Sequence, residues 1–311
     1  MLERAQRQQL LPSMPPIHIA LTFDDSYWAP AFATMRSICL TTRRRGDLVF
    51  HLCHRTMAED HKADLLEITS EFGAELRFYD IDRMPLFGEV AGRAPYNYRL
   101  SNIVYARLLF ADILPPEVQR VTYLDCDMMV RAPIEEVAEV DLGPYPIAAV
   151  PDAEGMNISL GRDIRTKRDL FDPADPYFNA GLIVIDMQKW RAADIIGKLE
   201  KAMADGVMVR LYYDQDFLNL VFNRNWLKLD QMWNLVDPRP VHQALHPKLV
   251  HYTGAGKPWR FTNVAFRRTY RHVMSNRVYA KYRRYRWARA WSKPFRNMVA
   301  LFRTIKSSRA G

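Results

Sequence analysis

The chain has 311 residues, 49% of them hydrophobic, which is enough to bury one large core or two modest ones. Its formal net charge of +9 is unevenly spread: residues 260–311 hold 15 Lys or Arg and no acidic residue, whereas residues 1–259 have a net charge of −6. Residues 1–16 are polar and lack the apolar stretch of a signal peptide, and no apolar run approaches the roughly 20 residues that span a bilayer. We therefore expect neither secretion by such a signal nor membrane insertion.

The first 252 residues alternate between predicted strands and predicted helices. Short apolar runs indicate buried strands, and apolar residues repeating every three or four positions indicate amphipathic helices. This alternation predicts βαβ units, and hence a mostly parallel sheet with helices on both faces. The predicted strands are 17–23, 47–52, 75–79, 121–124, 147–150, 181–186 and 248–252, and the predicted helices are 31–39, 57–72, 101–113, 187–204 and 215–222.

The chain contains three cysteines, Cys39, Cys53 and Cys126. Their number is odd, and their spacing matches neither a metal site nor a disulfide framework. A reducing compartment is therefore the simpler expectation.

Acidic residues gather where the predicted strands end. Asp24 and Asp25 follow the first strand, Asp125 and Asp127 follow the fourth, and Asp152 follows the fifth. In open parallel sheets, ligands bind beyond the carboxyl ends of the strands. Carboxylates gathered at that edge repel one another unless a cation or a donor-rich ligand lies among them.

Two of these segments together describe a metal–diphosphate site. Asp125 and Asp127 can both face one hard cation, and their oxygen ligands suit Mg²⁺ or Mn²⁺. Later in the chain, His251 offers a third ligand, Gly254 lets the backbone approach a diphosphate closely, and Lys257 neutralises it. Taken singly, the first segment could be a solvated acidic turn and the second a surface loop with an ordinary lysine.

Six short motifs occur in order between residues 17 and 259. They are Ile-Ala-Leu-Thr-Phe-Asp24-Asp25-Ser-Tyr27, Tyr105-Ala-Arg107-Leu, Tyr-Leu-Asp125-Cys-Asp127, Tyr177-Phe-Asn179-Ala180-Gly181, Asp214-Gln215-Asp216, and the stretch from His251 to Trp259. With these motifs the chain resembles the retaining family 8 glycosyltransferases, in particular bacterial lipooligosaccharide and lipopolysaccharide galactosyl- and glucosyltransferases. The resemblance implies an α/β fold with a mostly parallel, Rossmann-like sheet of the nucleotide-diphospho-sugar transferase type, a single-domain glycosyltransferase A-like fold. The catalytic domain would cover residues 17–259, after a polar segment 1–16 and before a basic helical extension 260–311.

The resemblance also implies roles for the matching residues. Asp125, Asp127 and His251 would bind Mn²⁺ or Mg²⁺, and Asp24 and Tyr27 would hold the uracil by hydrogen bonding and stacking. Ser26 stands where the family usually has Asn, and a hydroxyl replaces one amide hydrogen bond but not both. The residues implied at the UDP-sugar are Thr22, Asp24, Asp25, Ser26, Tyr27, Arg107, Asp125, Cys126, Asp127, Asn179, Ala180, Gly181, Asp214, Gln215, His251, Gly254 and Lys257.

Three residues are the implied catalytic group: Gln215, Asp214 and, near the acceptor, Asp152. The donor sugar would be recognised by Arg107, Asn179, Ala180, Asp214 and Gln215. Simpler alternatives are an exposed helix arginine for Arg107, a turn residue for Asn179 and a helix cap for Asp214. Retention normally needs a nucleophile opposite the leaving group, but a glutamine is a poor one. A same-face substitution is therefore favoured, with the Gln215 carbonyl dipole as electrostatic support; a nucleophilic role for Gln215 stays open.

The extension after Trp259 has the pattern of a basic amphipathic helix. Trp287, Trp291, Phe295, Met298 and Phe302 recur on one helical face among arginines and lysines, and Pro294 is expected to bend or divide the helix. Such a segment suits an anionic membrane surface. Packing of residues 279–285 on the body is the next alternative, and nucleic-acid binding is not expected because phosphate contacts need no apolar stripe.

The resemblance therefore implies a metal-dependent enzyme that transfers galactose or glucose from a UDP-sugar to a glycan or glycolipid acceptor, a lipopolysaccharide core, with retention. It would be cytoplasmic and peripheral on the inner face of the cytoplasmic membrane. One alternative is a UDP-sugar hydrolase or pyrophosphorylase, or a transferase that acts on a non-lipid acceptor. Another is a basic lipid- or nucleic-acid-binding protein with a degenerate catalytic body, which the intact metal and lysine set opposes.

Overall fold

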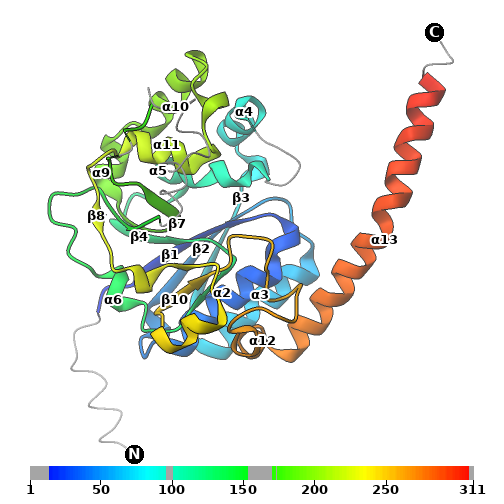
Figure 1. Ribbon diagram of the computed structural model, residues 1–311, viewed down its shortest axis with the longest axis horizontal. Coiled ribbons are helices and arrows are strands. Elements are labelled where there is room, and N and C mark those ends of the chain that lie inside the picture. Colours follow the sequence, from blue (N-terminus) through cyan, green and yellow to red (C-terminus); the bar gives the residue numbers. More distant parts are fainter. Residues whose placement is uncertain (1–13, 96–100, 153–169, 173, 308–311) are drawn as a thin grey trace, which may run out of the picture.

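The computed structural model describes residues 14–95, 101–152, 170–172 and 174–307, with side chains as far as Trp291 (Figure 1). Its strands are β1 Ile17–Phe23, β2 Leu48–His54, β3 Glu75–Asp80, β4 Arg120–Leu124, β5 Met128–Val130, β6 Ile147–Pro151, β7 Phe178–Asp186, β8 Leu227–Lys228, β9 Leu235–Val236 and β10 Leu249–His251. Its α-helices are α2 Trp28–Thr41, α3 Glu59–Phe72, α4 Pro85–Arg93, α5 Phe110–Ile113, α6 Glu135–Ala138, α9 Met187–Ala192, α10 Ile195–Ala204, α11 Tyr213–Val221, α12 Arg267–Met274 and α13 Asn276–Ser307. The 3₁₀ helices are η1 Asp25–Tyr27, η2 Arg45–Asp47, η3 Ile81–Arg83, η4 Asn102–Leu109, η5 Met208–Arg210, η6 Gln231–Trp233 and η7 Pro240–Leu245.

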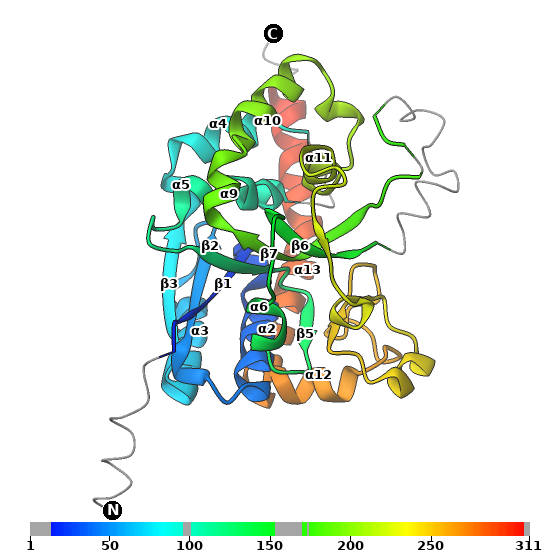
Figure 2. The same cartoon turned by 90° about the vertical axis from the view of Figure 1, so that its left-hand side faces the viewer.

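The expected α/β fold with a mostly parallel sheet is confirmed. Seven described strands form the main sheet in the order β3-β2-β1-β4-β7-β6-β8. Strand β7 runs antiparallel to both of its neighbours, β4 and β6, and it begins at Phe178, three residues before the predicted start. Because of this reversal, the first residues of β7 lie at the edge where β4 ends. A second sheet, β5-β10-β9, adjoins that edge (Figure 2).

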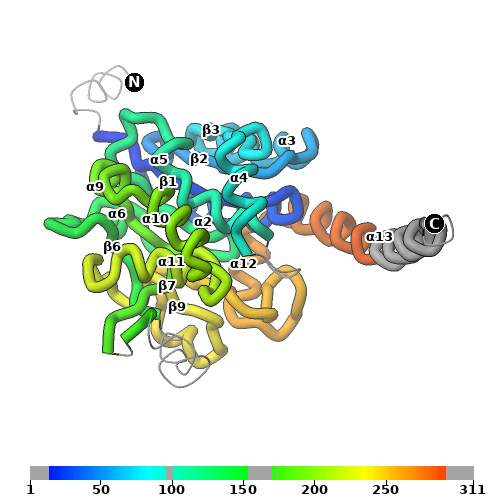
Figure 3. The backbone as a smooth tube through the Cα atoms, turned by 90° about the horizontal axis from the view of Figure 1, so that it is seen from above, coloured from blue at the N-terminus to red at the C-terminus, as the bar shows by residue number. Residues whose placement is uncertain are grey.

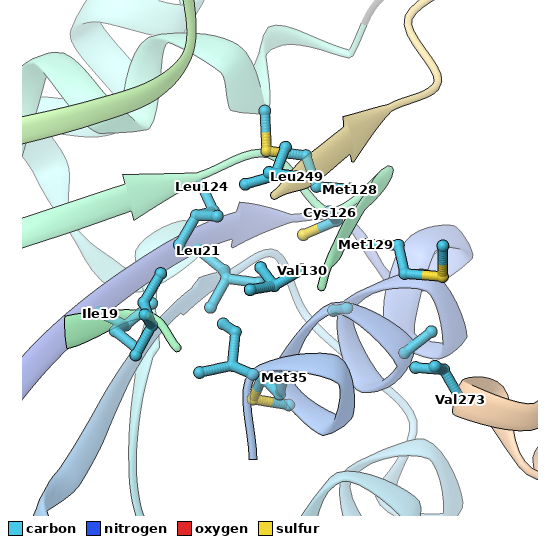
Figure 4. Packing of buried hydrophobic residues seen from close by; sticks show 14 of the residues in the cluster. Ile19, Leu21, Met35, Leu124, Cys126, Met128, Met129, Val130, Leu249 and Val273 are labelled. Atoms are coloured by element: carbon cyan, nitrogen blue, oxygen red, sulfur yellow. The ribbon is translucent and has the colours of Figure 1, made fainter. Parts of the chain in front are cut away.

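Helices cover both faces of the main sheet, and each face has its own hydrophobic core. On one face α2, α3 and α12 pack beneath β1 and β5, and on the other η4, α5, α9, α10 and α11 pack above (Figure 1). Figure 4 shows Leu21, Met35, Val130 and Val273 in the first core, brought together from β1, α2, β5 and α12. Nearly every residue of α2 from Trp28 to Cys39 is buried, because this helix is enclosed on all sides.

Two predicted helices differ from those observed. The segment predicted as a helix over 101–113 is mostly the 3₁₀ helix η4, continued by the short α5. The segment predicted over 187–204 is divided into α9 and α10 at Asp194, which has φ of 48° and caps α10 by accepting a hydrogen bond from the Gly197 N–H.

The C-terminal extension has two parts with different surroundings. Val273, Val278 and Tyr282 belong to the same core as β1 and α2. Farther along, α13 leaves the body (Figure 3). Its Trp287 and Trp291 side chains are 68% and 73% exposed. Of the two expectations for Pro294, a bend or a division, the division is wrong, because the helix continues as one element past this residue. Among the described residues, no helix combines the length and apolar character that crossing a membrane requires.

All three cysteines are free thiols within the protein interior. Burial raises the pKa of each thiol, to about 12 for Cys39 and well above the usual range for Cys126. None of them therefore carries an accessible thiolate at neutral pH.

Candidate active site

Strand pairing brings two carboxylates and an imidazole together at one edge of the sheet. Asp125 directly follows β4, and its N–H donates to the Gly181 carbonyl of β7 at 2.9 Å. The ladder between β5 and β10 then places His251 opposite Met128. One ligand atom from each of Asp125, Asp127 and His251 lies within 4.8 Å of the others, so the set, here called the candidate metal site, could hold a metal ion.

A chain of hydrogen bonds fixes which nitrogen of His251 faces this site. The Gly181 N–H donates to Asn179 Oδ1, so that atom is an acceptor, and Asn234 Nδ2 also donates to it at 2.8 Å. Asn234 Oδ1 must then accept from Nδ1–H of His251 at 3.0 Å.

Nε2 is consequently the nitrogen that faces Asp127 Oδ1, 3.1 Å away. A metal ion placed between these two atoms would be bound through Nε2, the arrangement expected of a ligating histidine whose other nitrogen is held by a neighbouring side chain.

Glycine is required at position 181 by the close approach of His251. A Cβ atom at this position would lie 2.3 Å from His251 Cε1, 2.7 Å from Met128 Cε and 2.9 Å from Asn179 Oδ1. The neighbouring groups are buried and cannot all move away. Gly181 therefore contributes space to the candidate metal site.

Lys257 places a buried cation beside the carboxylates. Its amine donates to Asp127 Oδ2 at 2.6 Å and also to the carbonyls of Tyr252 and Thr253. Burial by itself would raise the pKa of Asp127, but its interactions with the neighbouring Lys257 and His251 hold it well below its usual range. The Gly254 N–H, expected at a diphosphate, donates to Asp237 Oδ1 at 2.9 Å.

Arg107 joins the candidate metal site to α11. Its guanidinium is buried, pairs with Asp125 at 3.1 Å and with Asp214 at 2.7 Å, and donates to the Ala180 carbonyl. Burial raises the pKa of the Asp214 carboxyl to about 6, although the Arg107 charge acts in the opposite direction. The alternatives of an exposed arginine and of a helix cap are therefore wrong: Asp214 lies within the first turn of α11, and Asp216 accepts from the Tyr212 N–H instead.

Gln215 is held at both ends of its amide. Asn219, one turn later, bonds the Phe178 N–H and carbonyl, which fixes α11 over the start of β7. Gln215 Oε1 then accepts from the Ala180 N–H at 3.1 Å and from Asn179 at 3.3 Å, and its Nε2 donates to Asp152 at 3.0 Å. Asn179 lies within strand β7, so its interpretation as a turn residue is wrong.

The residues expected at the uracil belong to the segment 24–27, here called loop 24–27. Asp24 Oδ1 accepts from the Ser26 N–H and hydroxyl, and the Tyr27 ring meets Trp259 edge-on at 6.0 Å. Asp25 does not join the other strand-end carboxylates, because it pairs with His61 of α3 at 2.7 Å. Thr22 contacts the Tyr123 hydroxyl at 3.2 Å, and the Cys126 thiol is directed at the Thr22 carbonyl.

The sequence interpretation missed three residues that hold the site together. Asn234 orients His251, Asp237 binds the turn at Gly254, and the Tyr123 hydroxyl donates to Asp125 at 2.5 Å. Asn234 and Asp237 flank the two-residue strand β9, which is too short to produce a recognisable pattern. Tyr123 was visible in the sequence as the residue two positions before Asp125, a spacing that puts both side chains on the same side of an extended backbone.

Comparisons with known proteins bear on the family and the fold of this chain. The sequence model of the family described as Glycosyl transferase family 8 matches residues 18–263. General stress protein A of Bacillus subtilis (strain 168) is 26% identical over 281 residues, covering 83% of this chain and 93% of that protein. The probable galacturonosyltransferase-like 3 of Arabidopsis thaliana is 30% identical over 266 residues, covering 78% of this chain and 74% of that protein. A crystal structure of galactosyltransferase LgtC, in complex with donor and acceptor sugar analogues, shares the fold with a TM-score of 0.69 and 24% identity, covering 83% of this chain and 95% of that one.

Proposed function

Because the chain belongs to glycosyltransferase family 8, we propose that it transfers a hexose from a UDP-sugar to a glycan acceptor with retention of configuration. The proposed hexose is galactose or glucose, and the proposed acceptor is a sugar of a lipopolysaccharide core. The observation that supports this most is the convergence of Asp125, Asp127 and His251 beside the buried Lys257 amine. Oxygen and nitrogen ligands next to a fixed cation suit a divalent metal and a diphosphate.

The proposed donor site divides the work among neighbouring residues. Mn²⁺ or Mg²⁺, held by the candidate metal site, would offset the negative charge of the UDP leaving group. Lys257 would add a second positive charge at the diphosphate, and Asp24 and Tyr27 would hold the base. Arg107 would keep Asp214 and Asp125 at a fixed separation, because one guanidinium pairs with both carboxylates.

A same-face substitution is the proposed route to retention. Both lone pairs of the Gln215 carbonyl oxygen are engaged, by the Ala180 N–H and the Asn179 amide, which disfavours this oxygen as a nucleophile. We favour a step in which the anomeric bond to phosphate breaks, the bond to the acceptor oxygen forms on the same face, and the departing phosphate takes the acceptor's proton. Gln215 would hold Asp152 and the start of β7 in place.

The test is a panel of UDP-sugars with Mn²⁺, in which UDP release is measured with and without candidate lipooligosaccharide acceptors. We expect release that depends on the acceptor and is lost in EDTA or in the Asp127→Ala variant. Asp141→Ala, which removes a surface carboxylate, is the matched control and should keep full activity. Equal UDP release with and without glycan would instead identify a hydrolase, and activity that persists in EDTA would contradict the metal assignment.

The exposed part of α13 supports a second element of the proposal, binding to an anionic membrane surface at the inner face of the cytoplasmic membrane. Trp287 and Trp291 are the most exposed tryptophans described, and exposed arginines surround them, Arg283, Arg284 and Arg289. Aromatic side chains bury apolar area in a lipid interface, while each basic residue gains about 1 kcal/mol near an anionic surface.

Vesicle binding tests this element. The full chain should bind anionic vesicles better than neutral ones and should lose this binding at high salt. A chain that ends after Arg286 should bind neither kind of vesicle. Trp287→Ser should weaken binding, whereas Val209→Ser, which changes an equally exposed apolar residue on the body, should not. If the protein binds RNA or DNA but no vesicles, the partner of α13 is a nucleic acid and not a membrane.

A further inference from the structure

Helix α13 contacts two loops of the proposed donor site, and neither contact is explained by membrane binding. The Tyr282 hydroxyl donates to the Ser26 carbonyl of loop 24–27 at 3.0 Å. Four residues later, Arg286 Nη1 donates to the Trp259 carbonyl at 2.5 Å. Residues four apart share one face of a helix, so a single surface of α13 holds both loops. Residues 253–259, here called loop 253–259, carry Lys257.

The two loops meet where α13 holds them. Tyr27 of loop 24–27 and Trp259 of loop 253–259 contact each other edge-on, with ring centroids 6.0 Å apart. Under the proposed function, which this inference assumes, the first loop contacts the base and the second the diphosphate. Their separation therefore decides whether one nucleotide can reach both.

The part of α13 that carries these contacts is anchored on the body. Val278 is fully buried, and Tyr282 is only 4% exposed. The buried carboxylate of Asp64 in α3 pairs with Arg277 at 2.8 Å and with Lys281 at 2.6 Å. The helix can consequently act as a fixed support for the loops, because its own position is set by α3 and by the core.

We infer that Tyr282 and Arg286 are positioning residues for donor binding: they hold loop 24–27 and loop 253–259 at the separation that a nucleoside diphosphate spans. Both bond backbone carbonyls, so they act on the loops whatever side chains the loops carry. Loss of either bond would widen the range of loop positions and weaken donor binding, while the reacting groups on β7 and α11 would stay in place. The signature is a raised donor KM with an unchanged kcat.

The experiment measures the dissociation constant of UDP in the presence of Mn²⁺, donor KM and kcat, and melting temperature on the full chain. Tyr282→Phe removes one hydroxyl and keeps the ring, and it should weaken UDP binding about five-fold. Arg286→Gln should weaken it about ten-fold, because a charged donor is lost. Lys281→Gln is the matched control, since it removes one positive charge from the same helix and one of the two partners of Asp64, but no loop contact. It should lower the melting temperature but leave the UDP dissociation constant unchanged.

Three outcomes would overturn the inference in different ways. UDP binding that is equal in the wild type, Tyr282→Phe and Arg286→Gln would overturn the positioning role alone. Binding weakened as much by Lys281→Gln as by Tyr282→Phe would show that general docking of α13, and not the loop contacts, matters. A wild-type protein that binds no UDP would overturn the proposed function, and the positioning role with it.

Discussion

The candidate metal site and loop 24–27 are held in place by different means. Asp125 and His251 are placed by backbone ladders, β4 against β7 and β5 against β10, so their positions follow from strand register. Loop 24–27 is held by side chains from helices, His61 of α3 and Tyr282 of α13. A register cannot change by a fraction of a residue, whereas a side-chain contact can weaken gradually. We therefore expect substitutions at the candidate metal site to abolish function abruptly, and substitutions around loop 24–27 to weaken it gradually.

The largest expected effect breaks the strand-held region. Gly181→Ala places a methyl group against His251 and Met128, so His251 or the ladder must shift. We expect Mn²⁺ binding, measured by titration, and turnover to fall by about 100-fold or more. Gly88→Ala in α4 is the control, because its Cβ would meet nothing within 4 Å, and it should keep both. Normal Mn²⁺ binding by Gly181→Ala would contradict the close packing of this site.

A smaller effect is expected from the residue that orients His251. Asn234→Ala removes the acceptor for Nδ1–H and leaves the imidazole free to rotate. Metal affinity should fall by about 10- to 100-fold, as is usual for partners of ligating histidines. Asn223→Ala removes an exposed amide that bonds Asp175 and should leave the affinity unchanged. An unaltered affinity in Asn234→Ala would show that the ladder alone orients His251.

A pH titration of the free energy of unfolding tests the stability of the main sheet, separately from the two regions above. Burial, together with the neighbouring His18, lowers the pKa of His51 to about 3, against about 6.5 when unfolded. Below pH 6.5 the His51 imidazole takes up a proton in the unfolded chain, whereas in the folded chain it stays neutral until about pH 3. The free energy of unfolding should therefore fall by up to about 1.4 kcal/mol per pH unit between pH 6.5 and 3. Denaturant melts at several pH values measure this, and His51→Gln should flatten the slope. An identical slope in that variant would assign the effect to other groups.

The smallest effect is expected where a helix side chain supports a loop. His61→Ala removes the partner of Asp25, but the Ala58 N–H and the Tyr282 hydroxyl still hold loop 24–27. UDP affinity should fall by only about two- to five-fold, with Mn²⁺ binding unchanged. Complete loss of UDP binding in this variant would remove the distinction between abrupt and graded regions.

Much of the fold and of the candidate metal site could be predicted from local pattern. The strands just before Asp125 and Asp152 are visible because buried runs stop abruptly at carboxylates. The reversed direction of β7 could not be seen, because an apolar run has the same composition in either direction. That reversal brings Asn179 and Gly181 beside Asp125, which the motif order alone did not explain.

Helix packing was harder to predict than strand ends. The basic character of residues 260–311 favoured a membrane contact, and packing of residues 279–285 on the body was only the second alternative, yet Val278 and Tyr282 belong to the core beneath β1. Their partners, α2 and α3, lie more than 200 residues earlier, and such pairings have no local sequence signal. Asp64 illustrates this, since nothing in α3 distinguishes a buried carboxylate paired with Arg277 and Lys281 from a solvated one.

The enclosed thiols of Cys39, Cys53 and Cys126 make this chain convenient for spectroscopy. Maleimide dyes react with thiolates, and burial leaves these three with almost none. A cysteine introduced at the exposed Ala288 would then be the reactive position in the native background. An environment-sensitive fluorophore there would test whether α13 contacts lipid, beside the neighbouring Trp287 and Trp291 rings.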